Sequence, residues 1–218
     1  MEIVPGVHAV RLLGSRAHLI VEDELTLIDA GHRGSGTLLR RYLARIGRSI
    51  DEITRIVCTH GHPDHIGGVR EIAAASGAEV LLHRADAARL RITLRDVIAR
   101  PAPGTIVALL TRALDAPTHL DDGAILPALG GLRVVHTPGH TPGSICLYAP
   151  ERRILFTGDV LQMTAGHLDL PHPFFSDDLG LARRSIARLA ALDVETILFA
   201  HYPPLRDGVR DALRALAA

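Results

Sequence analysis

The sequence contains few aromatic residues and no tryptophan, and this shortage limits the kind of core that the chain can build. Among its 218 residues, Phe, Trp and Tyr together make up 3%, whereas hydrophobic residues as a class make up 47%. Enough apolar surface is present for a substantial core. That core must therefore consist mainly of aliphatic side chains.

Lysine is absent as well, so all 24 basic residues are arginines. They balance 24 acidic residues, and the formal net charge at pH 7 is zero. Nucleic-acid-binding domains usually show a cluster of basic residues that neutralises phosphates, and the sequence contains no basic run. We therefore expect a small-molecule substrate and no nucleic-acid partner.

Cysteines and long apolar segments are also scarce. Cys58 and Cys146 are the two cysteines, and each lies in an apolar run, which favours buried thiols over a disulfide framework or metal ligands. No segment approaches the roughly 18 consecutive apolar residues that a membrane span needs. The N-terminus lacks the basic and apolar regions of a signal peptide. We expect no membrane association and a cytoplasmic location.

The residues that are present alternate between short strand patterns and amphipathic helix patterns. We predict an α/β fold in a single domain spanning residues 1–218. Two helical stretches within 84–118 interrupt this pattern, and the sequence leaves open whether they cap an active site or serve only as structure. The expected strands are 8–13, 17–22, 25–31, 53–59, 79–83, 123–129, 132–137, 144–150, 153–160 and 195–200, and the expected helices are 34–47, 69–77, 179–191 and 207–217.

The stretch "CTHGHPDHIGG" (58–68) concentrates three histidines and an aspartate between an expected strand and an expected helix. Open α/β sheets place their sites at such carboxyl ends of strands. Imidazole and carboxylate groups are common ligands of zinc and similar ions. We interpret the cluster as a metal site, in which His60 and His62 face one point and Asp64 and His65 face a second.

Three later segments offer further ligands, each directly after an apolar strand. "HTPGHTPGS" (136–144) contains His136 and His140, "FTGDV" (156–160) contains Asp159, and "LFAHYPP" (198–204) contains His201. Residues at the ends of neighbouring strands can converge on one edge of a sheet. Because His136 lies earlier in its strand, we rank it below His140 as a ligand.

The motifs "THGHPDH", "TPGHTPGS", "FTGD" and "FAHYPP", preceded by "LTLIDAG", resemble the metallo-β-lactamase-fold hydrolase superfamily over roughly residues 5–205, in its glyoxalase II-like or lactonase-like branch. The resemblance implies a four-layer αβ/βα sandwich with two mixed β-sheets and outer helices. It also implies two divalent metal ions, by default Zn²⁺, with iron or manganese as alternatives. Asp29 would orient the ligand loop. Carried over by motif, His60, His62 and His140 would hold one ion, Asp64, His65 and His201 the other, and Asp159 would bridge both.

The same resemblance implies a hydrolase in which a metal-bridging hydroxide cleaves a small ester-like substrate. Asp64 and Asp159 would be the catalytic carboxylates, with Asp64 accepting or passing on a proton. A carboxylate at the bridging position resembles the thioesterase, lactonase and phosphodiesterase branches, and we favour a thioester or lactone over a phosphodiester. His167, His172 and Tyr202 are the candidates for contacts with substrate.

Three alternatives stay open at this point. A persulfide dioxygenase-like enzyme would bind a single iron through His60, His140 and Asp159. A β-lactam hydrolase or a non-catalytic metal-binding domain would also contain such motifs. The sequence does not distinguish a monomer from a homodimer.

Overall fold

The computed structural model describes residues 1–89, 94–99 and 117–218, and the chain divides into two compact units. The first unit is Met1–His119 and the second is Leu120–Ala218. Each unit contains one large mixed β-sheet with helices packed on it. The predicted single domain over residues 1–218 stays a prediction, and the two units are described separately below.

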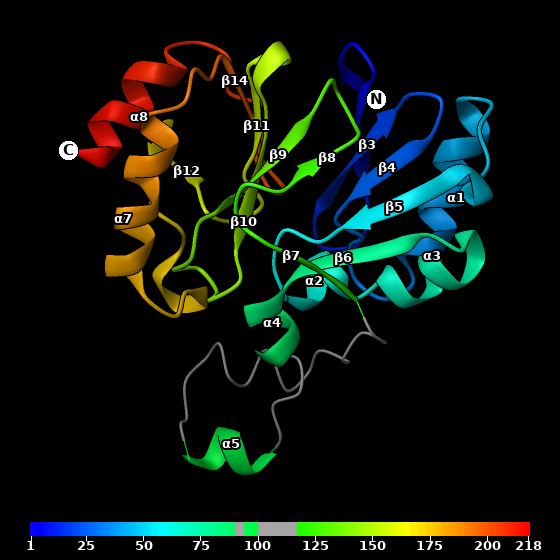
Figure 1. Ribbon diagram of the computed structural model, residues 1–218, viewed down its shortest axis with the longest axis horizontal. Helices are drawn as coiled ribbons and strands as arrows, with labels where there is room; N and C mark the ends of the chain where they lie inside the picture. The colour runs from blue at the N-terminus through cyan, green and yellow to red at the C-terminus, as the bar shows by residue number, and fades with distance from the viewer. Residues whose placement is uncertain (90–93, 100–116) are drawn as a thin grey trace. The chain divides into compact units, whose positions relative to one another are not determined.

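The first unit is built on a seven-stranded sheet in which the strands follow one another in chain order (Figure 1). Strands β1 to β4 pair antiparallel, and β4, β5 and β6 pair parallel. Parallel neighbours need a crossover connection, which α1 provides between β4 and β5, and α2 with α3 between β5 and β6. The strands are β1 (Glu2–Val4), β2 (Val7–Arg11), β3 (Arg16–Val21), β4 (Leu25–Ile28), β5 (Ile53–Val57), β6 (Glu79–His83) and β7 (Thr118–Leu120), and the helices are α1 (Ser35–Arg45), η1 (Ile50–Glu52), α2 (Pro63–Ile66), α3 (Val69–Ser76), α4 (Arg84–Arg89) and α5 (Leu94–Ala99).

The helix-covered face of this sheet forms an aliphatic core. Leu25 and Leu27 of β4 belong to the same buried cluster as Leu39 and Leu43 of α1. Each fully buried leucine contributes about 1.5–3 kcal/mol relative to an exposed one. The cluster fixes α1 and α3 against the sheet and thereby fixes the end of β5, where the histidine cluster begins.

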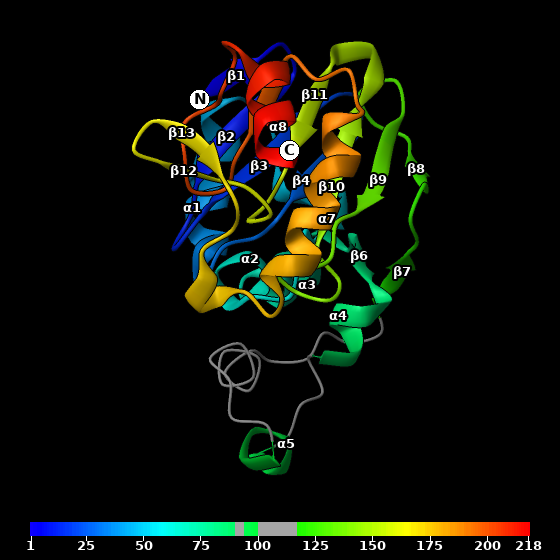
Figure 2. The same cartoon turned by 90° about the vertical axis from the view of Figure 1, so that its left-hand side faces the viewer.

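The second unit contains a five-stranded sheet in the order β14-β11-β10-β9-β8, of which only β11 and β14 are parallel neighbours. Helices α7 and α8 lie side by side against this sheet (Figure 2). Ile186 and Leu189 of α7 and Leu213 of α8 are buried in its core cluster. The elements are β8 (Ile125–Leu126), β9 (Leu132–His136), β10 (Ile145–Ala149), η2 (Pro150–Arg152), β11 (Ile154–Phe156), β12 (Gln162–Thr164), β13 (His167–Asp169), η3 (Pro173–Phe175), α7 (Leu179–Ala190), β14 (Thr196–Leu198) and α8 (Val209–Ala217).

The predicted strands and helices are present in the structure, and most of the strands are shorter than the sequence ranges predicted for them. The predicted strand 153–160 is confined to β11, because the chain leaves the ladder where "TGDV" begins. The hairpin β12–β13 was not predicted, since its short strands show no clear alternation. Its turn places Ala165 and Gly166 at φ 50° and 85°, which is typical of the tight hairpin turns that favour glycine.

The segment 84–118 is helical over its described residues 84–89 and 94–99. It contains α4 and α5 and then the start of β7. Residues 90–93 and 100–116 lie outside the described residues. Whether the segment caps an active site therefore stays a prediction.

Candidate metal centre

The histidine cluster of the first unit is divided between a turn and a short helix. His60 follows β5, and His62 is the residue before α2, where it adopts an extended backbone. Pro63 opens the helix, as a proline at the first helical position commonly does. Asp64 and His65 therefore project from one helical turn, whereas His60 and His62 project from the preceding turn of chain. This division fits the predicted grouping into two pairs.

The three imidazole rings of this cluster are buried and crowded. Their side chains are at most 4% exposed, and the centroid of the His60 ring lies 4.7 Å from that of His62 and 4.0 Å from that of His65. Two or three imidazolium ions at such separations would repel strongly in a poorly hydrated environment. The arrangement therefore favours neutral rings, which is the form that coordinates metal ions.

Asp29 fixes the cluster from the end of β4. Asp29 is 2% exposed, and its carboxylate accepts hydrogen bonds from two residues. Thr59 donates through its main-chain N–H and its hydroxyl, and His65 donates through Nδ1, with a shortest distance of 2.8 Å for each donor. Asp29 has φ 62°, a conformation that aspartate tolerates better than most residues. Since a carboxylate only accepts, His65 must carry its proton on Nδ1 and present the Nε2 lone pair. The geometry fits the predicted orienting role of Asp29.

Thr59 extends this control to a second histidine. The Thr59 hydroxyl donates to the carboxylate of Asp29. Nδ1 of His60 lies 3.1 Å from the hydroxyl oxygen of Thr59. A hydroxyl has one proton, so Nδ1 of His60 is the donor in this contact and Nε2 carries the lone pair. Sequence reasoning missed Thr59, although a hydroxyl residue directly before the first histidine was a usable signal.

Asp86 holds the turn between His60 and His62. This aspartate of α4 is fully buried, and its Oδ2 accepts the main-chain N–H of Gly61 at 2.6 Å. A Cβ at Gly61 would lie 3.2 Å from the same oxygen, so glycine at this position allows the carboxylate to approach. No signal in the sequence singled out Asp86, because an aspartate in a helical pattern usually faces solvent.

Gly68 allows the helix that follows the cluster to pack directly on the strand-end segment carrying Asp29. A Cβ at Gly68 would lie 2.3 Å from the carbonyl oxygen of Ala30, a distance that no side chain tolerates. The main-chain N–H of Gly68 donates to the carbonyl of Gly31 at 2.9 Å. Glycine at this position thus allows the start of the helix to pack closely on that segment.

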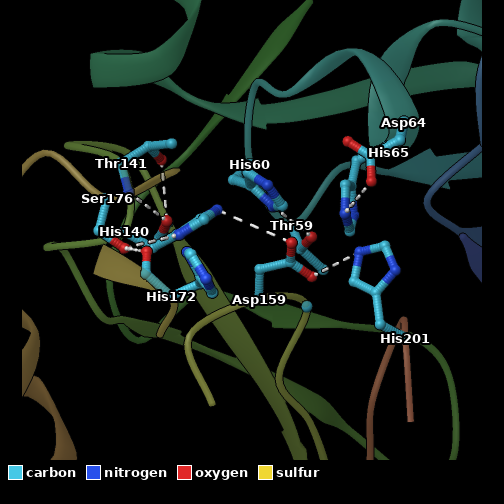
Figure 3. A network of polar contacts seen from close by, with 12 residues as sticks. Thr59, His60, Asp64, His65, His140, Thr141, Asp159, His172, Ser176 and His201 are labelled. Carbon is cyan, nitrogen blue, oxygen red and sulfur yellow. Dashed lines mark hydrogen bonds and ion pairs between the residues drawn. The ribbon is translucent and has the colours of Figure 1, made fainter. Parts of the chain in front are cut away.

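In the second unit, Asp159 lies between two histidines, as Figure 3 shows. Its Oδ1 is 3.2 Å from Nε2 of His201, and its Oδ2 is 3.8 Å from Nε2 of His140. Asp159 follows β11 and His201 follows β14. Because these two strands are parallel neighbours, their carboxyl ends lie together, which explains how residues far apart in the sequence come into contact.

His140 lies in a turn that is fixed by its neighbours. It is 2% exposed, and its Nδ1 lies 3.1 Å from the hydroxyl of Ser176. The preceding Gly139 has φ 140°, and a Cβ there would lie 2.3 Å from the main-chain nitrogen of Ala182. Only glycine permits this approach of the turn to α7. Sequence reasoning missed Ser176, which lies in a segment with no motif.

His136, the competing candidate in the same motif, has a different role. Its Nε2 donates to the carbonyl of Pro142 at 2.9 Å, and its own carbonyl accepts from Arg188 at 2.6 Å. These bonds tie the two sides of the turn together. They occupy Nε2, one of the two ring nitrogens, and agree with ranking His136 below His140.

The three candidates for substrate contacts have different surroundings. His172 precedes η3 and lies beside His140 in Figure 3. The Tyr202 hydroxyl donates to Gln162 of β12 at 3.4 Å, and His167 is exposed at the start of β13. Their predicted contacts with substrate stay predictions. Two side chains that sequence reasoning missed, Phe174 and Phe175 of η3, are 59% and 45% exposed.

Both cysteines are buried thiols, as predicted. Burial raises the pKa of Cys146 to about 12 and raises the pKa of Cys58 well above its ordinary value. Such thiols are neutral at physiological pH and are poor nucleophiles and ligands. The chemistry of the site therefore belongs to the histidines and aspartates.

The donors of each unit suit a divalent cation. Nδ1 of His65 carries the proton, so its Nε2 lone pair faces Oδ2 of Asp64 at 3.5 Å. In the second unit the carboxylate of Asp159 faces the Nε2 atoms of two rings. Opposed lone pairs of nitrogen and oxygen are stabilised when positive charge lies between them. Nitrogen and carboxylate oxygen are also the donors that zinc, iron and manganese accept.

Comparison with known proteins defines the class. The family model of the metallo-beta-lactamase superfamily matches residues 10–201, which include every predicted ligand. The chain belongs to this superfamily. The predicted α/β fold of the metallo-β-lactamase type is confirmed, and so is the prediction of a metal-dependent hydrolase of this superfamily.

Individual proteins add detail to this class. The chain is 28% identical to the probable metallo-hydrolase YflN of Bacillus subtilis (strain 168), over 94% of this chain and 86% of that protein. It is 33% identical to the acyl-coenzyme A thioesterase MBLAC2 of Homo sapiens over 67% of this chain, and it spans about half of that protein, 55%. The crystal structure of the metallo-beta-lactamase family protein TTHA1429 from Thermus thermophilus has a TM-score of 0.78 and 25% identity, covering 99% of this chain and 79% of that one.

Within residues 1–89, 94–99 and 117–218, none of the helices has the length and apolar character needed to cross a bilayer.

Proposed function

We propose that the protein is a binuclear metal-dependent hydrolase that cleaves a small thioester or lactone. The observation that carries this proposal is Asp159, which turns one carboxylate oxygen toward His201 and the other toward His140. A carboxylate that bridges two ions needs this arrangement. We propose that His60, His62 and His140 hold one ion, that Asp64, His65 and His201 hold the other, and that Asp159 bridges them.

Two divalent ions, when bound, would supply a hydroxide nucleophile near neutral pH and a Lewis acid for the oxygen under attack. The residues of the chain would orient the ligands and handle protons. Asp29 keeps Nε2 of His65 in its lone-pair form. Asp64 is suited to accept or pass on a proton, because its side chain is 24% exposed while Ser15 holds its main-chain carbonyl at 2.5 Å.

The exposed aromatic side chains support an acyl substrate. Phe174 and Phe175 pack edge to face with ring centroids 5.0 Å apart, and their segment is hydrogen-bonded to His140 through Ser176. Exposed aromatic pairs commonly mark binding surfaces. One relative carries the name of an acyl-coenzyme A thioesterase. We therefore favour a thioester with an apolar acyl group.

The test measures metal content and hydrolysis on the same protein. We expect close to two metal ions per chain, loss of hydrolysis on chelation, and recovery on addition of Zn²⁺. A panel of acyl thioesters, lactones, phosphodiesters and β-lactams should show a clear preference for the first two classes. Longer acyl chains should lower KM, since each buried methylene contributes about 0.8 kcal/mol.

The chain offers a matched control for this test. His140→Gln should lose one ion and nearly all activity, whereas His136→Gln, in the same motif, should retain both, because its Nε2 is bonded to Pro142. A single bound iron with oxygen uptake would instead indicate a dioxygenase. Two bound ions with no hydrolysis across the panel would contradict the proposed reaction.

A further inference from the structure

Ser176 contacts both His140 and the segment carrying His172. It follows η3, and its hydroxyl lies 2.8 Å from the carbonyl oxygen of His172 and 3.1 Å from Nδ1 of His140. In Figure 3, Ser176, His140 and His172 lie together on one side of Asp159. The contact with His140 joins residues 36 positions apart.

The direction of the two hydrogen bonds follows from their chemistry. A carbonyl oxygen only accepts, so the Ser176 hydroxyl donates its single proton to His172. The hydroxyl oxygen is then the acceptor for His140, whose Nδ1 must carry the proton. Nε2 of His140 therefore presents its lone pair, and that nitrogen is the one that faces Oδ2 of Asp159 at 3.8 Å.

The main chain around His140 is anchored without this hydroxyl. The N–H of Asp177 donates to the carbonyl of His140 at 3.1 Å, and the N–H of Asp178 donates to the carbonyl of Gly139 at 2.9 Å. These bonds set the position of the turn. The Ser176 hydroxyl sets which nitrogen of the ring is protonated and how the ring is turned.

We propose that Ser176 is a positioning residue that fixes the metal-binding tautomer of His140 through the carbonyl of His172. The proposal rests on the proposed function for the identity of His140 as a ligand. It gives the second unit a counterpart to the first, where Asp29 and Thr59 fix the tautomers of His65 and His60.

The experiment compares Ser176→Ala with Ser185→Ala and Ser176→Thr. Ser185 is the matched control, because its hydroxyl donates at 2.7 Å to the carbonyl of Pro138, in the same turn as His140, and this bond involves no ring. Long-range ¹H–¹⁵N correlation spectra of the metal-free proteins at about pH 8, where imidazoles are normally neutral, report the tautomer directly. Competition with a chromophoric chelator for Zn²⁺ measures the affinity of each ion.

We expect His140 to be protonated on Nδ1 in the wild-type protein and in Ser185→Ala, and to populate both tautomers in Ser176→Ala. Loss of such an orienting partner typically weakens metal binding by about 10–100-fold, and here only one of the two ions should be affected. Ser176→Thr, which restores a hydroxyl, should recover the wild-type tautomer. These results together would support the positioning role.

Wild-type tautomer and wild-type affinity in Ser176→Ala would overturn the proposal, and so would equal losses in Ser176→Ala and Ser185→Ala, which would indicate loop packing alone. The failure of the proposed function looks different, because the wild-type protein itself would then bind fewer than two ions. The tautomer spectra are recorded without metal and are read independently of that result.

Discussion

The two units supply their candidate ligands in contrasting ways. The first unit places four of them within six consecutive residues, His60 to His65, and buries the three rings against one another. The second unit draws three from separate strand ends, at positions 140, 159 and 201. The candidate ligands of the first unit are therefore a local feature of the chain, whereas those of the second depend on sheet topology.

The orienting groups differ in the same way. In the first unit a buried carboxylate, Asp29, controls two histidines, one directly and one through Thr59. In the second unit a neutral hydroxyl, Ser176, controls one histidine. Charge-assisted hydrogen bonds are roughly twice as strong as neutral ones. The first unit should thus be the more rigid half, and damage to its orienting group should cost more.

The largest effect should come from Asp159→Ala, which removes the carboxylate shared by His140 and His201. We expect kcat/KM to fall on the order of 10³-fold, because metal-based catalysis contributes several kcal/mol and each 1.4 kcal/mol is tenfold. Far-UV circular dichroism should remain unchanged. Asp193→Ala, which removes an exposed ion-pair partner of Arg153, should keep full activity. Activity of Asp159→Ala within tenfold of the wild type would exclude the bridging role.

The next largest effect should come from Asp29→Asn. Asparagine tolerates the positive φ of this position, but its amide group would place a donor where Nδ1–H of His65 also donates. His65 would then move its proton to Nε2, and we expect metal affinity to fall about 10–100-fold, by more than in Ser176→Ala. Asp51→Asn, at an exposed aspartate of η1, is the control. Equal losses in Asp29→Asn and Ser176→Ala would remove the asymmetry between the units.

The sequence allowed the ligand candidates to be predicted because each is a residue type with strong chemical preference, placed directly after an apolar strand. It did not allow Asp86 or Ser176 to be predicted. Their roles depend on contacts between distant segments, over 25 positions from Gly61 to Asp86 and 36 from His140 to Ser176. Serine and aspartate in loops and helices have many ordinary roles, and only the geometry distinguishes these.

The fold shows the same limit. Helices α1, α3 and α7 were predicted nearly to their ends, because amphipathic spacing marks all three locally and a glycine follows α1 and α3. The hairpin β12–β13 was missed, since two three-residue strands contain too little pattern. That hairpin carries His167 and Gln162, so the part of the chain after Asp159 that was least predictable is also the part on which substrate preference should depend.

The smallest effect concerns a buried histidine outside the ligand set. His18 of β3, in the first unit, is 5% exposed, and burial, with a smaller contribution from Arg16, lowers its pKa to about 3. In the unfolded chain a histidine titrates near 6.5. Between these two pH values the unfolded state binds the additional proton. The free energy of unfolding should therefore fall as pH falls from about 6.5 toward 3, and His18 should contribute no pH dependence above that range.

The measurement is the urea midpoint of the metal-free protein between about pH 7 and pH 4.5, a range within the window set by the two pKa values. His18 alone should remove up to about 1.4 kcal/mol of stability per pH unit below 6.5. His18→Gln cannot bind that proton, so its stability should fall less steeply than that of the wild type. His119→Gln, at an exposed histidine of β7 in the same unit, should keep the wild-type slope. Parallel slopes for all three proteins would mean that His18 takes up the same proton in the folded state as in the unfolded chain, and burial would then not lower its pKa.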